Sequence, residues 1–130
     1  MLSVKLPVKK SAGVTLVELM ITLAIIGVLS AIAIPMYTDF IATARQAVMS
    51  DNIGSIRLFE ESYKLEHRVY YAGSYLPSDP DATDGLKAVI GWSPGTGQDV
   101  IEYEVVLAGN GFTVTATHLE FADTVVTKTF

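Results

Sequence analysis

One carboxylate lies inside an otherwise apolar run of this sequence. Between Val14 and Tyr37 the only ionisable side chains are those of Glu18 and Tyr37, and most other residues are Leu, Ile, Val, Ala or Met. A charge that is taken out of water is tolerated only when a partner compensates it. The chemistry that Glu18 offers is therefore the pairing of its carboxylate with a cation.

The other candidate groups lie in the C-terminal half and form no catalytic pattern. His67 and His118 are the two histidines, and neither has a serine or a carboxylate at the spacing of a known catalytic motif. Asp79, Asp81 and Asp84 do not form an EF-hand loop, because Asp84 occupies the sixth position, where that loop needs glycine. We expect a solvated turn there, with a different kind of calcium site as the alternative. We expect no catalytic residue, no metal and no cofactor.

Composition and charge exclude several classes of protein. The chain has 130 residues, half of them hydrophobic, and no cysteine, so it has neither disulfides nor thiolate metal ligands. Three of its nine basic residues, Lys5, Lys9 and Lys10, precede the apolar run, and without the first 13 residues six basic groups face fourteen acidic ones. Such a surface repels nucleic acid. Basic residues before an apolar segment instead favour a cytoplasmic N-terminus beside a membrane.

Three interpretations of the N-terminal region compete. A secretory signal would use Ala31-Ile32-Ala33 as its cleavage site, but Glu18 would then interrupt an apolar region that is already longer than usual. A plain membrane anchor explains the length, since about 20 apolar residues cross a bilayer, but it does not explain the glutamate. The third interpretation rests on the residues around Glu18.

The segment Gly13-Val14-Thr15-Leu16-Val17-Glu18 follows a short lysine-bearing leader and begins a long apolar helix. This arrangement resembles the type IV pilin family, whose members share a leader that ends in glycine, a Thr-Leu-x-Glu start and a hydrophobic helix. The resemblance is specific over residues 9–40 and only architectural afterwards. Val14 departs from the pattern, because phenylalanine is the commoner residue at that position.

The resemblance implies processing and assembly sites. A prepilin peptidase would cleave between Gly13 and Val14, and the new amine of Val14 would be N-methylated. Glu18 would meet the N-terminal amine of a neighbouring subunit as subunits pack through their helices into a filament. The alternative from the residues alone is that Glu18 is a local helix-start carboxylate, which favours the helix dipole in the first turn.

Gly27 and Pro35 interrupt the apolar helix. Proline in a helix interior removes a hydrogen bond, and glycine costs about 1 kcal/mol relative to alanine. In pilins a glycine and a proline at matching places flank a stretch that can lose helicity in the fibre. A tolerated kink is the alternative, and the residues do not separate the two.

The fold is predicted as α+β and pilin-like. After Pro35 apolar residues recur at three- and four-residue steps, with polar residues such as Glu60 between them: Phe40, Ala44, Val48, Met49, Ile53, Ile56, Phe59 and Tyr63. This pattern predicts one helix over residues 15–66, its apolar half protruding and its amphipathic half packed on a C-terminal antiparallel β-meander. Alternation predicts strands at 100–107, 112–118 and 124–130, the first two joined by the turn Ala108-Gly109-Asn110-Gly111. The residues expected to face inward are Ile101, Tyr103, Val105 and Leu107 on the first strand and Phe112, Val114 and Ala116 on the second. A further short strand is expected within residues 86–92.

We therefore expect five regions. They are a cleaved leader (1–13), a hydrophobic transmembrane and polymerisation helix (14–37), its amphipathic continuation (38–67), an αβ-loop (68–99) and the antiparallel sheet of the head (100–130).

The expected function is that of a type IV pilus subunit. It would be held in the inner membrane as a precursor and then polymerised on the cell surface for adhesion or motility. Its partners would be copies of itself, the prepilin peptidase and N-methyltransferase, and a pilus assembly platform. A pseudopilin of a type II secretion system is the alternative, and a secreted enzyme is disfavoured by the lack of a catalytic constellation.

Overall fold

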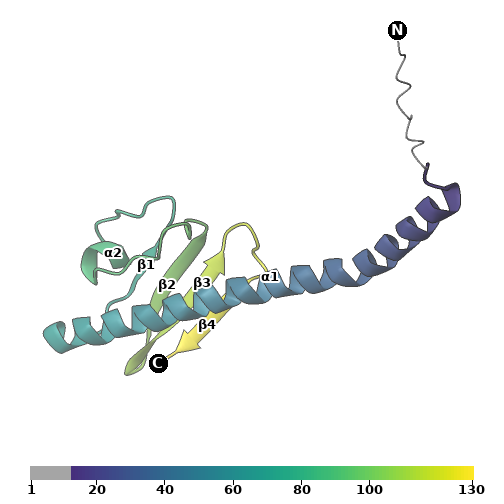
Figure 1. Cartoon of the computed structure of the whole chain (residues 1–130). Coiled ribbons are helices and arrows are strands. Elements are labelled where there is room, and N and C mark those ends of the chain that lie inside the picture. The colour runs from purple at the N-terminus through teal and green to yellow at the C-terminus, as the bar shows by residue number, and fades with distance from the viewer. Residues whose placement is uncertain (1–12) are drawn as a thin grey trace, which may run out of the picture. The chain divides into compact units, whose positions relative to one another are not determined.

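The computed structural model describes residues 13–130, so the predicted leader lies outside the described residues except for Gly13. The longest element is the helix α1 (Leu16–His67), which runs from purple to teal in Figure 1. Its 52 residues extend over about 78 Å at 1.5 Å per residue. The helix ends at His67, because the next residue, Arg68, has a positive φ of 68° that breaks the helical backbone. The predicted helix is confirmed to within one residue at each end.

The chain divides into two compact units, and the boundary falls within α1, between Asp39 and Phe40. In the first unit every described side chain is exposed except Ser30, which is partly exposed. This part of the helix is apolar on all sides, which is typical of a helix that lipid or other helices cover. By length and composition α1 can cross a membrane, and none of its most apolar window is buried within the chain.

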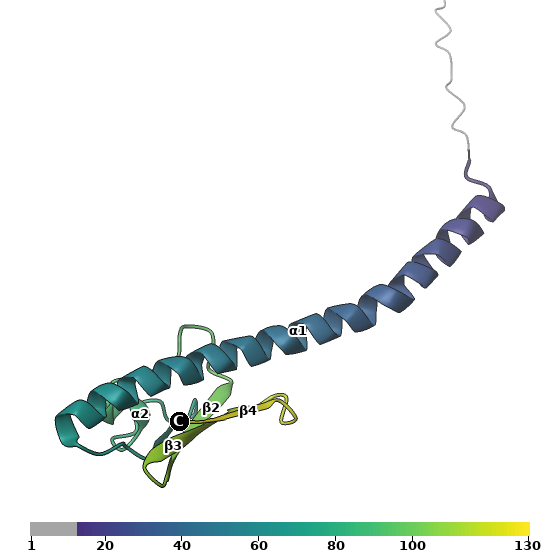
Figure 2. The same ribbon diagram turned by 90° about the horizontal axis from the view of Figure 1, so that it is seen from below.

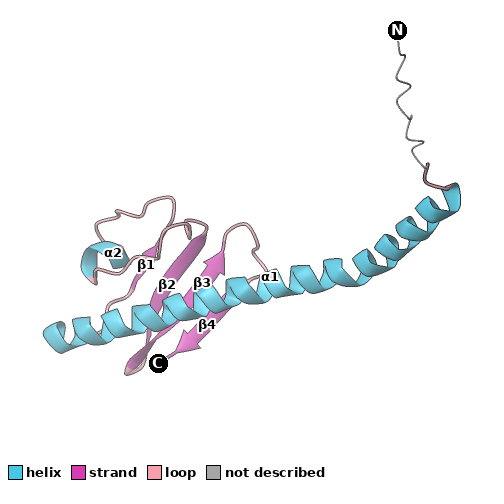
Figure 3. Ribbon diagram, viewed as in Figure 1, coloured by secondary structure: helices cyan, strands magenta, loops and turns pink. Residues whose placement is uncertain are grey.

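The second unit, Phe40–Phe130, contains a four-stranded antiparallel sheet in the order β1-β2-β3-β4 (Figure 3). The strands are β1 (Gly73–Tyr75), β2 (Ile101–Ala108), β3 (Gly111–His118) and β4 (Val125–Thr129). Gly109 adopts φ 59° in the turn between β2 and β3, a conformation that glycine tolerates best. The predicted strands and turn are confirmed, and β1, which sequence reasoning missed, adds a short edge strand beside β2.

The strand expected within residues 86–92 is wrong, because this segment forms the one-turn helix α2 (Leu86–Val89). Backbone bonds of the helical type run from Val89 to Gly85 and from Ile90 to Leu86, both at 3.1 Å. Leu86 and Ile90 stand four residues apart, so a helical turn brings both side chains to the core. The four-residue spacing of Leu86 and Ile90 indicates a helical turn, whereas a short apolar segment taken alone fits a strand equally well.

The core lies between the sheet and the second half of α1, which runs along one face of the sheet (Figure 2). Its members are buried hydrophobic side chains from the helix, the strands and the αβ-loop: Met49, Ile53, Ile56, Tyr75, Leu86, Trp92, Ile101, Tyr103, Val105, Phe112, Val114 and Ala116. The predicted inward alternation holds on β2 and β3 except at Leu107, which is 51% exposed. Leu107 lies next to the hairpin turn, where Tyr70, Phe112 and Phe130 already pack together.

The predicted apolar stripe of α1 is only partly confirmed. Phe40, Ala44, Val48 and Phe59 are exposed, whereas Met49, Ile53, Ile56 and Glu60 are fully buried. These four positions follow steps of four, three and four residues and share one helical face. The stripe therefore ends on a carboxylate, which sequence reasoning had assigned to the polar side.

Candidate functional site

Thr15 and Glu18 form a capping box at the start of α1. The Glu18 backbone N–H donates to the Thr15 hydroxyl at 3.2 Å, and Glu18 Oε2 accepts from the Thr15 backbone N–H and hydroxyl, each at 3.2 Å. Each residue thus satisfies a backbone donor of the other, as in the Ser/Thr-x-x-Glu box that begins many helices. The carboxylate also lies at the positive end of the helix dipole.

The structure gives Glu18 a local role at the start of the helix. No ion pair of Glu18 occurs among residues 13–130, and the capping bonds come from Thr15 alone. The local helix-start alternative therefore describes the isolated chain. The capping contacts do not test pairing with a second chain, so that role stays a prediction.

Gly13 and Val14 precede the helix and lie in exposed backbone without regular structure. A Cβ built on Gly13 would meet nothing within 4 Å, so the fold of this chain makes no steric demand for glycine at that position. Val14 is 75% exposed. The peptide bond between Gly13 and Val14 is therefore exposed. Because the fold does not require glycine at position 13, only a molecule that binds this segment could impose that requirement.

Gly27 and Pro35 both lie inside the continuous helix. A Cβ at Gly27 would likewise meet nothing within 4 Å, so close packing within the chain does not explain the glycine. Pro35 has no N–H to donate to the carbonyl of Ala31, and Thr38 Oγ1 donates to the Pro35 carbonyl at 2.8 Å. The helix therefore continues through both residues and lacks one backbone hydrogen bond, at Pro35. That the two residues weaken the helix stays a prediction.

The second unit does not bring the other candidate residues together. His67 stacks on Tyr63 with ring centroids 4.0 Å apart, while His118 is buried and accepts the Glu120 backbone N–H at 3.3 Å. Asp81 pairs with Lys87 at the surface. Within residues 13–130 no group of three or more His, Cys, Asp or Glu side chains is placed to hold a metal ion.

Glu60 is the functional candidate that sequence reasoning missed. Its side chain is fully buried, Oε2 accepts the Tyr71 backbone N–H at 2.9 Å, and Oε1 has no hydrogen-bond partner. Burial raises the pKa of the carboxyl, and the bond from Tyr71 only partly opposes this shift. The four-three-four spacing from Met49 is the signal that could have placed Glu60 in the core.

A polar layer joins the αβ-loop to the helix beside this core. Asn52 donates to the Tyr103 hydroxyl at 2.6 Å and also bonds to Gln98, and the Trp92 indole N–H donates to Ser55 Oγ at 2.6 Å. These bonds satisfy the buried polar atoms of the loop and fix it on α1.

Comparison with known proteins agrees with the N-terminal geometry. The family model of the prokaryotic N-terminal methylation motif matches residues 8–34. The type IV major fimbrial protein FimA of Dichelobacter nodosus is 33% identical over 110 residues, which cover 79% of this chain and 69% of that protein. A fimbrial protein of Pseudomonas aeruginosa is 43% identical over 58 residues, or 45% of this chain and 38% of the relative.

Further similarity extends to the type IV major pilin protein PilA of Myxococcus xanthus, 39% identical over 61 residues that cover 47% of this chain and 28% of the relative. The chain spans less than two thirds of the length of most of these relatives. No solved structure matches it. The methylation motif, the capped apolar helix, the antiparallel sheet and the long match to FimA agree, and the chain belongs to the type IV pilin family.

Proposed function

We propose that this chain is the structural subunit of a type IV pilus, held in the inner membrane by its N-terminal helix and then polymerised into a surface filament for adhesion or motility. The observation that carries the proposal is the exposed run of α1 from Leu16 to Tyr37, which is apolar on every side and has Glu18 as its one carboxylate. Neither water nor the chain's own fold offers this surface a favourable environment. Lipid suits it before assembly, and sibling helices suit it afterwards.

Processing prepares the helix for assembly. A prepilin peptidase cleaves between Gly13 and Val14, both of which lie in exposed, irregular backbone. The amine released on Val14 is then N-methylated, and a methylated amine keeps its positive charge. It lies four residues before Glu18, so in a helix that extends back to Val14 after cleavage the two groups share one face.

Glu18 supplies the countercharge during assembly. In the membrane the Thr15 hydroxyl and N–H stabilise its carboxylate. As subunits leave the lipid and pack through their helices, the amine of a neighbouring chain pairs with that carboxylate. A buried charge without a partner is strongly destabilising, so the pair selects the register of packing. An assembly platform in the inner membrane would drive this step.

The role is structural and involves neither catalysis nor a cofactor. A pseudopilin of a type II secretion system would share the leader, the glutamate and the helix, but no observation favours it. The relatives described above are named fimbrial or pilin proteins, which supports the pilus.

Electron microscopy of cells with and without the gene tests the proposal. Long surface fibres that disappear with the gene support a pilus subunit, whereas a short periplasmic fibre would indicate the pseudopilin. The mass of the mature protein is the companion measurement. A chain that begins at methylated Val14 is expected, and a chain that begins at Ile34, after Ala31-Ile32-Ala33, would show ordinary secretion instead.

A further inference from the structure

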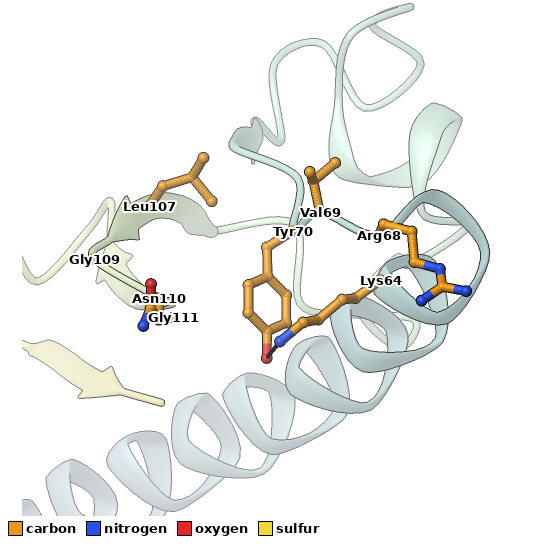
Figure 4. Close-up of a pocket in the computed structure, with 8 residues that line it drawn as sticks. All are labelled: Lys64, Arg68, Val69, Tyr70, Leu107, Gly109, Asn110 and Gly111. Atoms are coloured by element: carbon orange, nitrogen blue, oxygen red, sulfur yellow. Dashed lines mark hydrogen bonds between the residues drawn. The ribbon is translucent and has the colours of Figure 1, made fainter.

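A cleft lies between the end of α1 and the turn that joins β2 to β3 (Figure 4). It has a volume of about 560 Å³. Lys64, Arg68, Val69 and Tyr70 form one wall, and Leu107 with the Gly109-Asn110-Gly111 turn forms the other. Lys64 and Arg68 are its charged lining residues, and Val69 and Leu107 are its aliphatic ones, so the cleft is cationic with walls of mixed polarity.

The two cations of the cleft differ in how they are held. Lys64 donates to the Tyr70 hydroxyl at 3.0 Å and lies 4.1 Å from the centre of that ring, while the hydroxyl donates to Glu61 at 3.0 Å. Arg68 is held past the helix end by its backbone, whose N–H donates to the Lys64 carbonyl at 2.8 Å. Lys64 is thus fixed in place, and the Arg68 guanidinium extends into solvent.

Arg68 is also the basic residue of the described chain whose side chain has no partner. The other five, in residues 13–130, each contact an aromatic ring, a hydroxyl or a carboxylate: Arg45, Arg57, Lys64, Lys87 and Lys128. In a chain with an excess of acidic groups, an unpaired guanidinium next to a second cation is a site for a carboxylate.

The opposite end of the sheet carries the complementary surface. The turn between β3 and β4, residues 119–124, exposes Glu120 and Asp123 together with the apolar side chains of Leu119 and Phe121. Asp99 lies beside it, because the Leu119 N–H donates to the Val100 carbonyl at 2.8 Å. We call this surface, Asp99 with residues 119–124, the acidic turn.

The acidic turn is pre-organised for contact. The Thr124 N–H donates to the Phe121 carbonyl at 2.7 Å, and the Arg45 guanidinium lies 3.7 Å from the centre of the Phe121 ring. His118 packs edge-on against the same ring, 5.0 Å away. A turn that is already ordered loses little conformational entropy when it binds.

The topology prevents one chain from joining these two surfaces. In a meander successive connections lie at opposite ends of the strand they share, so the cleft and the acidic turn lie at the two ends of β3 (Figure 1). The eight residues of β3 separate them by about 26 Å. Two copies can make the contact that one copy cannot.

From this complementarity we infer that the cleft of one head binds the acidic turn of the next copy of the chain, a contact that rests on the proposed filament function. Lys64 and Arg68 meet the carboxylates of Glu120 and Asp123, and the apolar residues of both surfaces pack around these pairs. The contact joins two different surfaces, so it repeats without closing and generates an open array. It also offsets the repulsion between acidic heads and fixes their register.

Charge reversal in the full chain tests the contact. Arg68→Glu alone, and Glu120→Lys with Asp123→Lys, should each reduce the ratio of sheared surface fibre to membrane-held subunit by about tenfold, because like charges then face each other. Arg68→Glu combined with Glu120→Lys alone exchanges one charge pair and leaves Lys64 a carboxylate at Asp123, so this combined reversal should restore the ratio to near the parent value. Lys87→Glu, the same charge change at a basic residue outside the cleft, is the matched control and should leave fibre yield unchanged.

The outcomes separate this contact from the proposed function. A parent chain that forms no fibre contradicts the pilus itself. If the parent forms fibre and Arg68→Glu does too, the cleft is not an assembly surface. Loss of fibre that the combined reversal does not restore would mean that the acidic turn is not its partner. Equal protease resistance of the membrane-held variants shows that each head is folded.

Discussion

Glu60 on α1 accepts the backbone N–H of Tyr71 at 2.9 Å through one carboxylate oxygen, while its other oxygen is buried without a partner. The bond joins the last turns of the long helix to the segment that leads into β1. It satisfies a backbone donor that the chain would otherwise bury after the helix ends. The same burial penalises the charged form of the carboxyl and raises its pKa.

Folding of the head should depend on pH through Glu60. The folded state holds the Glu60 proton more tightly than the unfolded state does. The protonated carboxyl therefore stabilises the fold fully at any pH below the pKa that Glu60 has in the unfolded chain. The free energy of unfolding should then fall as the pH rises from the unfolded pKa to the raised folded one. Each unit by which the pKa is raised corresponds to about 1.4 kcal/mol. Thermal unfolding of the detergent-solubilised chain between about pH 4 and pH 8 measures this change.

Glu60→Gln should remove this component of the pH dependence, because the amide accepts the Tyr71 N–H without titrating. Above the raised pKa the variant should also be at least as stable as the parent. Glu66→Gln, at an exposed carboxylate of the same helix, is the matched control and should retain the parent slope. An unchanged slope in Glu60→Gln would show that the buried carboxyl is not the titrating group.

The second unit should fold without the first. The fragment Phe40–Phe130 contains every member of the hydrophobic core and should be soluble, with a cooperative thermal transition and circular dichroism of mixed helix and strand. A fragment that begins at Gly73 loses Met49, Ile53 and Ile56. Each such side chain contributes about 2–5 kcal/mol, against a total stability of about 5–15 kcal/mol for a domain. Cooperative unfolding of the shorter fragment would contradict the packing of the sheet on α1.

The sequence predicted the elements that have a strong local period. Residues 100–107 alternate cleanly and end in a glycine-rich turn, so β2 and its hairpin with β3 could be placed without a structure. The helix was predicted because a long apolar run leads, without a turn signal, into a segment whose apolar residues recur at three- and four-residue steps. The type and approximate bounds of these elements follow from short-range patterning alone.

Features that depend on a distant partner were not predicted. β1 has three residues and exists only because Gly73, Ser74 and Tyr75 pair with β2 about thirty residues later. Glu60 was assigned to the polar side because glutamate is usually exposed, whereas its position on the helical face decides its burial.

At the N-terminus the sequence indicated Glu18 but not the reciprocal bonds with Thr15, although the Thr-x-x-Glu spacing encodes them.

Pro35 and Gly27 should leave residues 28–34 the least protected part of the apolar helix. The carbonyl of Ala31 has no proline N–H to accept, and glycine costs about 1 kcal/mol of helix stability relative to alanine. Hydrogen exchange of the chain in detergent micelles should therefore be faster in residues 28–34 than in the flanking turns. Pro35→Ala and Gly27→Ala should slow it, and fibres of these variants should extend less under force.

Gly54→Ala is the matched control for this comparison, because Gly54 lies in the same helix, has no atom within 4 Å of an added Cβ and is far from the tested segment. It should leave exchange in residues 28–34 unchanged. Uniform protection along the parent helix would contradict the weakening and leave both residues as tolerated irregularities.

Thr15 and Glu18 allow the two roles of the glutamate to be separated. Glutamine also fits the third helical position of a capping box, so Glu18→Gln keeps the local bonds and removes only the charge. Thr15→Val keeps the charge and the side-chain shape but removes the capping hydroxyl, which costs about 0.5–2 kcal/mol. Comparing the two variants therefore separates the effect of helix capping from the effect of charge pairing.

If Glu18 pairs with the amine of a neighbouring chain, Glu18→Gln should abolish most fibre, because losing one partner of a buried pair costs about 3–5 kcal/mol at every added subunit. Thr15→Val should reduce fibre only modestly. Cleavage at Gly13 and the amount of membrane-held subunit should be normal in Glu18→Gln, since the mutation removes a charge from the apolar segment. The measurement is the ratio of sheared fibre to membrane-held subunit, with the mature mass as a check on processing. The opposite ranking, normal fibre in Glu18→Gln and little in Thr15→Val, would reduce Glu18 to a helix cap.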